Sequence, residues 1–227
     1  MNVVHIYTAY QPKDPETIRR NQLAESTWKA QPWKEVPVED RNLPRLWREE
    51  NRAFPYIKDI FDLGITGLAD DDIGIYTNAD ILVTTNCTAA VIACLSQSDA
   101  CYAYRRDFKR LDAALPDAEV SKGHDYAGSD LCGFRAGWWR KHRAVFPDMI
   151  LGHEAWDPCY RIMVDQTNPG KAVSVRDVIY HERHDSYWER EKNRYRLAGQ
   201  IRCLTLAARF MRSRGVDPKS HYLPPNL

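Results

Sequence analysis

The stretch DIGIYTNADILVTT, residues 72–85, says most about how this chain folds. Its alternating isoleucines give the pattern of a buried strand, and the polar break that follows presents Asn78 and Asp80 two positions apart. A second apolar run follows at residues 81–83. An amide and a carboxylate at the end of a strand suit a hard divalent cation, which takes oxygen ligands and commonly keeps waters and phosphate oxygens. The alternative is a turn in which both side chains bond to their own backbone.

Length and composition narrow the class of protein. A chain of 227 residues suits one large domain better than two small ones. The net charge of +1 gives no global attraction to a polyanion. The six cysteines form no C-x-x-C pair, which argues against a zinc ribbon and favours small buried side chains in a reducing compartment. The sequence shows neither a secretory leader nor a run of the ~20 apolar residues of a membrane span. We therefore expect a cytoplasmic protein without a transmembrane segment.

Strand and helix patterns alternate along the chain. Strand patterns cover residues 3–7, 34–38, 73–76, 100–104, 129–135 and 173–180. Helix patterns cover residues 16–28, 45–63, 88–95, 152–164 and 190–214, and another begins at residue 138. Pro55 marks a break within the pattern over residues 45–63. Such alternation predicts an α/β layered fold. We expect one main domain over residues 1–190, with a mixed central sheet flanked by helices, and a basic amphipathic helix and tail over residues 191–227 packed on it.

Four pieces of sequence follow one another in a distinctive order. They are the strand ending at Thr8 with the helix that carries Arg19 and Asn21, the stretch YTNAD at residues 76–80, the stretch YAGSDLCGFR at residues 126–135, and the pair GHEAWD at residues 152–157 and DVIYH at residues 177–181. In this order they resemble the nucleotide-binding start, the Asp-x-Asp metal motif, the sugar-side strand, and the acceptor-side helix and terminal histidine of the GT-A glycosyltransferases. The resemblance implies a nucleotide-sugar-dependent enzyme on a single Rossmann-like sheet.

A metal site is the first implication of this resemblance. Asp80 takes the place of the direct ligand, and Asn78 that of a supporting or water-mediated contact. Asn78 replaces the first aspartate of the family motif, which lowers the negative charge of the site. His181 is the implied histidine ligand, and His184 is a weaker candidate; a pair of exposed histidines at a strand end is the alternative. The expected cation is Mn2+ or Mg2+, which stabilises charge on a leaving diphosphate.

Donor contacts are the second implication, with a UDP-sugar as the expected donor. The implied residues are Thr8, Arg19, Asn21, Tyr126 and Asp130. Asp130 would accept hydrogen bonds from sugar hydroxyls, and a local turn or cap is its alternative role. Arg19 would clamp phosphate, since a guanidinium binds phosphate oxygens bidentately. Three further arginines suit the same role but are expected on solvated faces: Arg20, Arg105 and Arg106.

Two carboxylates are candidates for the general base. Glu154 and Asp157 are three positions apart, so both face one side if the segment is helical. An inverting transferase needs one base to take the proton of the acceptor hydroxyl. Asp157 stands between Trp156 and Pro158, where partial desolvation would raise its pKa. The sequence does not separate the two, and decoration of a helix N-terminus is the alternative role for both.

The sequence thus predicts a metal-dependent glycosyltransferase, a hexosyl- or pentosyltransferase, that moves a sugar from a nucleoside diphosphate to an acceptor hydroxyl. The acceptor is a glycan or lipid-linked sugar, or a hydroxylated base in DNA. Basic and aromatic residues towards the C-terminus, from residue 187, suit a nucleic acid, an acidic glycan or peripheral contact with an anionic membrane. A solvated helix face without a partner is the alternative for this segment. The alternative is a catalytically inactive nucleotide- or polyanion-binding module. A nucleotidyltransferase would carry a glycine-rich loop after the first strand, and residues 8–13 contain no glycine.

Overall fold

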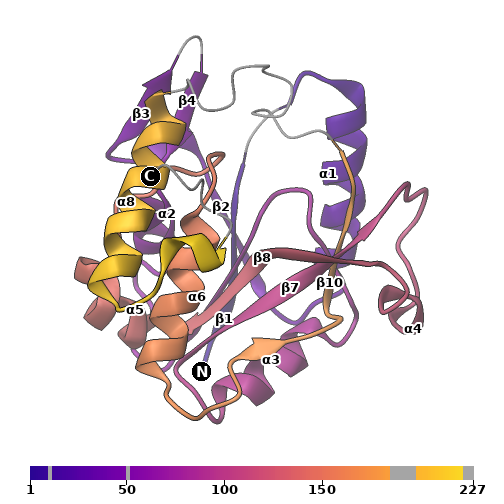
Figure 1. Ribbon diagram of the computed structural model, residues 1–227. Coiled ribbons are helices and arrows are strands. Elements are labelled where there is room, and N and C mark those ends of the chain that lie inside the picture. The colour runs from indigo at the N-terminus through magenta and orange to yellow at the C-terminus, as the bar shows by residue number, and fades with distance from the viewer. Residues whose placement is uncertain (10–11, 50–51, 185–197, 222–227) are drawn as a thin grey trace.

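Eight strands form a mixed sheet through the middle of the computed structural model, which describes residues 1–9, 12–49, 52–184 and 198–221 (Figure 1). The strands are β1 (Val3–Thr8), β2 (Lys34–Val38), β5 (Ile73–Thr77), β6 (Leu82–Val83), β7 (Ala100–Phe108), β8 (His124–Arg135), β9 (Ser174–Val175) and β10 (Ile179–Glu182). Their order across the sheet is β2-β1-β5-β8-β7-β10-β6, and β9 pairs with β7.

The direction of the strands gathers their ends at one edge. β1 pairs in parallel with β2 and β5, and β10 pairs in parallel with β7. β8 lies antiparallel between β5 and β7, so these two strands point the same way. The carboxyl ends of β1, β5, β7 and β10 therefore meet at one edge, which is where open α/β sheets bind ligands. All five residues of β5 are buried, as expected for a central strand covered on both faces.

Four helices cover one face of the sheet (left in Figure 1). They are α2 (Ile57–Gly64), α5 (Ala136–His142), α6 (Trp156–Thr167) and α8 (Ala198–Ser213). Phe61 of α2 packs its ring against Phe134 of β8 and Trp139 of α5. The apolar stripe of α8, which includes Cys203 and Leu204, is buried in the same cluster as α6. This core fixes the position of α6 behind the sheet edge.

The opposite face carries α1 (Pro15–Trp28) and α3 (Cys87–Leu95). Asp14 caps α1, since its carboxylate accepts a hydrogen bond from the backbone N–H of Thr17 at 2.9 Å, and Pro15 occupies the first turn, where its missing N–H costs nothing. Trp28 at the end of α1 is buried and donates its indole N–H to the carbonyl of Ile81 at 2.8 Å. This bond ties α1 to the segment that follows β5.

The predicted helix over residues 45–63 is wrong in its first half. Residues 46–55 form a two-stranded hairpin, β3 (Leu46–Glu49) and β4 (Arg52–Pro55), and only α2 is helical. Trp47 and Phe54 are cross-strand partners, and aromatic pairs of this kind stabilise antiparallel strands. Pro55 stops a helix from running through to α2. The apolar spacing that suggested a helix came from one strand pair and one helix read together.

Other boundaries also shift. The helix expected over residues 152–164 begins at Trp156 in α6, because Gly152 and Ala155 take positive φ angles of 86° and 77°. Glu154 therefore precedes the helix, and the expectation that it shares a helical face with Asp157 is wrong. The strand expected over residues 173–180 divides into β9 and β10. The predicted helix over residues 190–214 is described only as α8, since residues 190–197 lie outside the described part.

Four short elements complete the described part of the chain. They are η1 (Asp40–Asn42), α4 (Asp117–Val120) within the expected polar loop, η2 (Arg143–Val145) and η4 (Pro218–His221). All six cysteines lie in described segments and are free, and five of them are buried. Among the described helices, none combines the length and the apolar character that a membrane crossing requires.

Candidate functional site

Three candidate metal ligands come together from the ends of β5 and β10. Asp80 lies in the turn after β5, His181 lies within β10, and His184 follows it. The Oδ2 atom of Asp80 is 2.8 Å from Nε2 of His184 and 3.4 Å from Nε2 of His181. One ligand atom from each residue lies within 4.8 Å of the other two. Two imidazoles and a carboxylate in this arrangement can hold one divalent cation.

Asp107 orients the more buried of the two histidines. It is the register partner of His181 in the parallel pair of β7 and β10, and its Oδ1 atom is 3.3 Å from Nδ1 of His181. A histidine that binds a metal through one ring nitrogen generally donates the other N–H to a carboxylate or a carbonyl. Nε2 of His181 is therefore the atom free to face a cation. Burial would lower the pKa of His181, but Asp80 and Asp107 raise it overall.

The electrostatics around Asp80 favour its ionised form. Burial alone would raise the pKa of this carboxyl group, and the neighbouring His181 and His184 outweigh it and hold the pKa well below its ordinary value. Asp80 is thus ionised at neutral pH, which is the form of the carboxyl group that binds a cation.

Asn78 faces a different partner. Its Oδ1 atom accepts a hydrogen bond from the hydroxyl of Tyr76 at 2.9 Å, and its Nδ2–H donates to Oδ1 of Asp130 at 2.7 Å. Thr77 of β5 pairs with Leu131 of the antiparallel β8, so the next residues along, Asn78 and Asp130, lie opposite each other. Asn78 thus links the metal-side strand to the predicted sugar-side strand. Its predicted contact with a metal stays a prediction.

Arg105 continues this network across β7. Its Nη1–H donates to Oδ2 of Asp130 and its Nε–H donates to Oδ1 of Asp107, both at 2.8 Å. The ring of Tyr126 covers the guanidinium at 3.7 Å from its centroid. Although burial lowers the pKa of Arg105, Asp130 and Asp107 raise it overall, so the charge is permanent. Contrary to the expectation of a solvated face, Arg105 is mostly buried.

Asp157 has the properties of a general base. It lies in the first turn of α6, keeps part of its surface accessible, and accepts a hydrogen bond at Oδ2 from the backbone N–H of Ser129 at 3.1 Å. Burial, assisted by the nearby Asp130, raises the pKa of Asp157 to about 6. A carboxylate with this pKa is ionised at neutral pH and accepts a proton better than an ordinary aspartate. The predicted desolvation at this position is thus present.

Glu154 is held by the C-terminal helix. Its Oε2 atom accepts a hydrogen bond from Nε2 of Gln200 on α8, and its backbone N–H donates to Oε1 of the same residue, both at 3.0 Å. The reciprocal pair fixes the turn at residues 152–155 that leads into α6. This geometry suits a role in positioning Asp157 better than a role in proton transfer.

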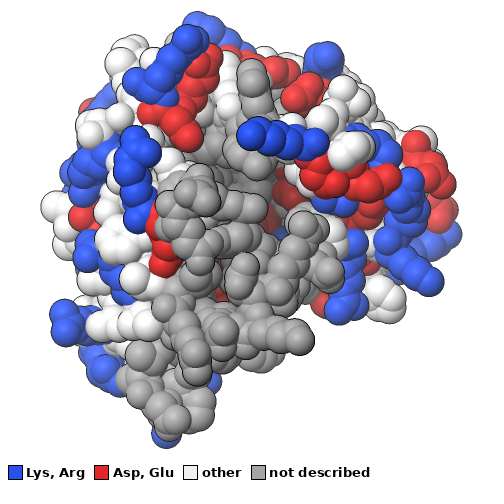
Figure 2. Space-filling view, turned by 90° about the horizontal axis from the view of Figure 1, so that it is seen from above, with Lys and Arg blue, Asp and Glu red and all other residues white. Residues whose placement is uncertain are grey.

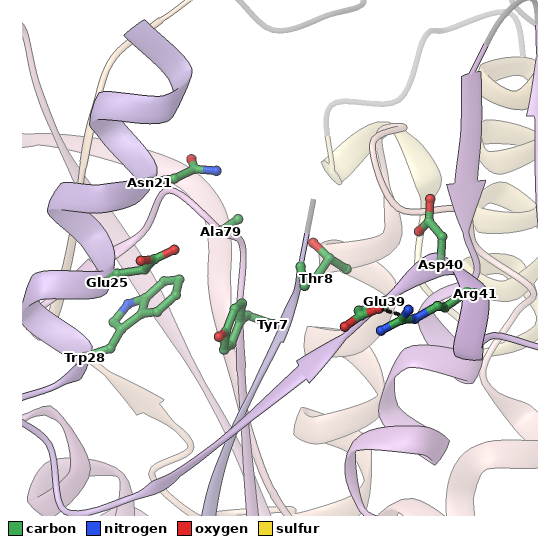
Figure 3. A pocket seen from close by; sticks show the side chains of 10 residues that line it. Tyr7, Thr8, Asn21, Glu25, Trp28, Glu39, Asp40, Arg41 and Ala79 are labelled. Carbon is green, nitrogen blue, oxygen red and sulfur yellow. Dashed lines mark ion pairs between the residues drawn. The ribbon is translucent and has the colours of Figure 1, made fainter. Parts of the chain in front are cut away.

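A cavity of about 610 Å³ opens beside the metal ligands, and Ala79, the neighbour of Asp80, lines it. Figure 3 shows Tyr7 and Thr8 entering from β1, and Asn21, Glu25 and Trp28 from α1. The remaining labelled side chains belong to Glu39, Asp40 and Arg41. The rings of Tyr7 and Trp28 lie 4.8 Å apart and form an aromatic wall. Burial, assisted by Glu35, raises the pKa of Tyr7 to about 12, so its hydroxyl stays protonated.

The predicted donor contacts take different places around this cavity. Thr8 and Asn21 line it. Tyr126 lies on β8, is 43% exposed as a residue, and places its ring over Arg105. Arg19 pairs with Glu182 of β10 and donates to the carbonyl of Leu111 at 2.7 Å, so its guanidinium braces α1 against neighbouring segments. The use of Arg19 as a phosphate clamp stays a prediction.

Negative charge dominates the immediate site. Asp80, Asp107, Asp130 and Asp157 gather around the strand ends. Among the residues that the structure describes, Arg105 is the arginine within their hydrogen-bond network. Such an excess of carboxylates favours a bound cation. The described surface around this edge, seen from above in Figure 2, carries both signs interspersed.

Comparisons with known proteins bear on the fold. No protein-family model and no curated protein matches the sequence. Among solved structures, S. aureus TarS 1–349 in complex with UDP-GlcNAc aligns with 97% of this chain and 69% of its own, at 11% sequence identity and a TM-score of 0.57. A second structure of S. aureus TarS 1–349 aligns with 93% of this chain and 71% of its own, at 9% identity and a TM-score of 0.49. The chain has a GT-A-type fold.

The GT-A-type fold confirms the fold class predicted from the sequence, including the mixed central sheet flanked by helices. The sequence analysis did not predict two features of the site. Asp107 contacts His181, and Arg105 hydrogen-bonds both Asp107 and Asp130. Their two-residue spacing on a strand was a usable signal, because it puts both side chains on one face of the sheet. Their partners across the sheet could not be known before the register was.

Proposed function

We propose that the protein is a metal-dependent glycosyltransferase that moves a sugar from a nucleoside diphosphate to an acceptor hydroxyl. One observation carries the proposal: a cluster of metal-ligating side chains borders, through Ala79, a cavity with an aromatic wall at the carboxyl edge of a GT-A-type sheet. A nucleotide in the cavity would have its diphosphate beside Asp80. Such an arrangement suits a donor whose leaving group needs charge stabilisation.

The cavity holds the nucleoside of the donor in this account. Tyr7 offers an aromatic ring against which a base can stack, and Asn21 offers both a donor and an acceptor. The carboxylates of Glu25 and Asp40 can accept hydrogen bonds from ribose hydroxyls or from a base N–H. We propose a UDP-sugar as the donor, in line with the UDP-GlcNAc bound by S. aureus TarS.

Asp80, His181 and His184 fit a divalent cation, with Asp107 supporting His181 from behind. Mn2+ or Mg2+ held there would supply Lewis-acid stabilisation of the charge that develops on the diphosphate. The excess of carboxylates around the three ligands is the feature of this site that suits such an ion.

The transfer itself uses Asp157 as the base. As the acceptor oxygen bonds to the anomeric carbon, the bond from that carbon to the diphosphate oxygen breaks, and Asp157 takes the acceptor proton. The products are the glycosylated acceptor and the nucleoside diphosphate. Asp130 would hold sugar hydroxyls, and Tyr126, with its exposed ring, would border the sugar. Glu154 would hold the turn before Asp157 in place.

The acceptor is a hydroxyl of a glycan or lipid-linked sugar, or of a hydroxylated base in DNA. A nucleic acid acceptor would bind less tightly as salt rises, because its phosphates release counterions on binding. A neutral glycan would show little dependence on salt. This comparison separates a nucleic acid from a neutral glycan without knowledge of the exact molecule.

Release of nucleotide from a panel of nucleotide sugars tests the proposal. We expect slow turnover of one donor that requires Mn2+ or Mg2+, stops with EDTA, and is lost in Asp80→Asn. Asp165→Asn, an exposed carboxylate on α6, is the matched control and should turn over like the wild type. Binding of nucleotide without turnover of any donor, with each acceptor class supplied, would instead favour an inactive binding module.

A further inference from the structure

Arg105 lies within an irregularity in the pairing of β7 with β8, and its side chain meets that of Asp107, two positions further along the same strand. The register shifts between Ala103 and Tyr104 and again between Tyr104 and Arg106. Irregularities of this kind re-aim side chains and occur next to active sites. Here the re-aimed guanidinium reaches Asp130 on one side and Asp107 on the other, at 2.8 Å each.

Each carboxylate held by Arg105 serves a different half of the site. Asp107 contacts Nδ1 of His181, whose other ring nitrogen faces Asp80. Asp130 accepts a hydrogen bond from Asn78 and lies on the predicted sugar side. One buried guanidinium therefore bridges the metal half and the sugar half. The side chains of Arg105, Asp107 and Asp130 are only 15%, 11% and 10% exposed, so water screens this bridge weakly.

Stability alone is a poor reason for this bridge. A buried ion pair recovers little more than the cost of removing its charges from water. The neighbouring Arg106, on the same strand, is an example of an arginine whose ion pairs have only a structural role. It pairs with Asp177 at 2.7 Å and with the exposed Asp125, away from the metal ligands.

We propose that Arg105 is a positioning residue that couples the two halves of the site: it fixes Asp107 against His181 and Asp130 against Asn78 at the same time. The proposal rests on the metal site and the donor site of the proposed function. Its consequence is that one side chain sets both the affinity for the cation and the affinity for the donor sugar. Arg105 itself touches neither the cation nor the reacting atoms.

The test is the affinity of the free protein for Mn2+ alone, followed by the electron paramagnetic resonance signal of unbound Mn2+. Removing the outer partner of a metal ligand typically costs 10–100-fold in affinity. We expect a loss of about this size in Arg105→Gln. Arg106→Gln removes the same charge from the next position of β7 and should match the wild type. Thermal unfolding of both variants monitors the fold separately.

Two further variants trace the coupling through its links. Asp107→Asn should weaken Mn2+ binding, and adding Arg105→Gln to it should cause no further loss, because both changes break one link. Asp130→Asn should leave Mn2+ binding unchanged and raise the KM for the donor. Arg105→Lys, which keeps the charge but can hold only one carboxylate, should impair one half of the site more than the other. This variant also decides the question if Arg105→Gln fails to fold.

The outcomes separate this inference from the function it rests on. A folded Arg105→Gln protein that binds Mn2+ as tightly as the wild type overturns the coupling and leaves the metal site intact. Equal losses in Arg105→Gln and Arg106→Gln overturn it as well, because they indicate a general charge effect. A wild-type protein that binds no Mn2+ overturns the metal site, and the coupling fails with it.

Discussion

Asp157 is the proposed general base, and burial and a neighbouring negative charge raise its pKa. It combines a backbone donor at Ser129, a neighbouring carboxylate at Asp130 and a partly accessible surface. A base in such a place is ionised at neutral pH and yet holds a proton readily. The local sequence, with Trp156 and Pro158 on either side, was enough to predict the desolvation but not the partners.

Asp157→Asn should lower kcat by roughly 10²–10⁴-fold, the usual contribution of a general base. The KM for the donor should change little, because Asp157 acts on the acceptor. Steady-state kinetics with the donor found in the panel measures both constants. A kcat within a few-fold of the wild type would remove Asp157 from the proposed role and return Glu154 to it.

The raised pKa of Asp157 also predicts how stability depends on pH. The pKa of Asp157 in the folded protein is about 6, above its ordinary value of 3.8, so the folded state binds this proton more tightly than the unfolded state. Burial of the ionised carboxylate therefore lowers the free energy of unfolding only above about pH 4, and this loss reaches its full size above about pH 6. Asp157→Asn should exceed the wild type in free energy of unfolding by on the order of 1–3 kcal/mol at pH 8. The difference should vanish near pH 4.

Denaturant unfolding of the two proteins at several pH values measures this effect. The kcat/KM of the wild type should rise with a midpoint near pH 6 and reach its plateau about one pH unit above it. The groups that face the carboxyl and take part in its titration are Asp130, Arg161 and Tyr126. A stability difference independent of pH would contradict the assigned titration of Asp157.

In the proposed metal site, His184 would supply a second imidazole, whereas the family motif would offer a carboxylate at position 78. Imidazole ligands suit transition metals, whereas carboxylates and waters suit Mg2+. We therefore expect tighter binding of Mn2+ than of Mg2+, and a large loss of Mn2+ affinity in His184→Ala. His142→Ala on α5 is the control. Calorimetric titration distinguishes this from a site that uses only Asp80 and His181, in which His184→Ala would bind as the wild type does.

At the scale of elements, the sequence predicted most strands and helices because their periodicities are local. It missed the β3–β4 hairpin, since Leu46 and Phe54 also fit a helical spacing, and the break expected at Pro55 did not by itself indicate two strands. The sequence indicated Asp80 and His181 as candidate metal ligands, because they lie at strand ends and in the order of the motifs of the GT-A family. The contact between Asp107 and His181 could not be predicted from the sequence, because it depends on the register between β7 and β10.

The N-terminus of α8 packs too closely to admit a larger residue at Gly199. A Cβ atom on Gly199 would come within 2.5 Å of Nε2 of His153 and 2.8 Å of Oε2 of Glu49. Gly199→Ala should therefore lower the free energy of unfolding by ~1–3 kcal/mol, the usual cost of overpacking. Arg209→Ala, at an exposed position of the same helix, should change it by about 0.5 kcal/mol or less. Denaturant unfolding compares the two, and equal effects would contradict the tight docking of α8.

At the scale of the whole molecule, the sheet order explains why residues distant in the chain share one site. The parallel strands carry the Thr8, Asp80, Asp107 and His181 regions to a single edge, and the antiparallel β8 brings Asp130 between them. The similarity to S. aureus TarS extends over nearly the entire chain at 11% identity, so the arrangement of elements persists where sequence similarity does not. The acceptor side has no such guide, since it depends on this chain's own surface.

A crystal structure of the protein with UDP and Mn2+ tests the central claim most directly, through the anomalous signal of the metal. The account predicts one Mn2+ peak among Asp80, His181 and His184. It also predicts the uridine in the cavity between Tyr7 and Asn21, with its diphosphate beside the ion. A Mn2+ peak away from these three ligands, or a nucleotide bound outside the cavity, would contradict the account.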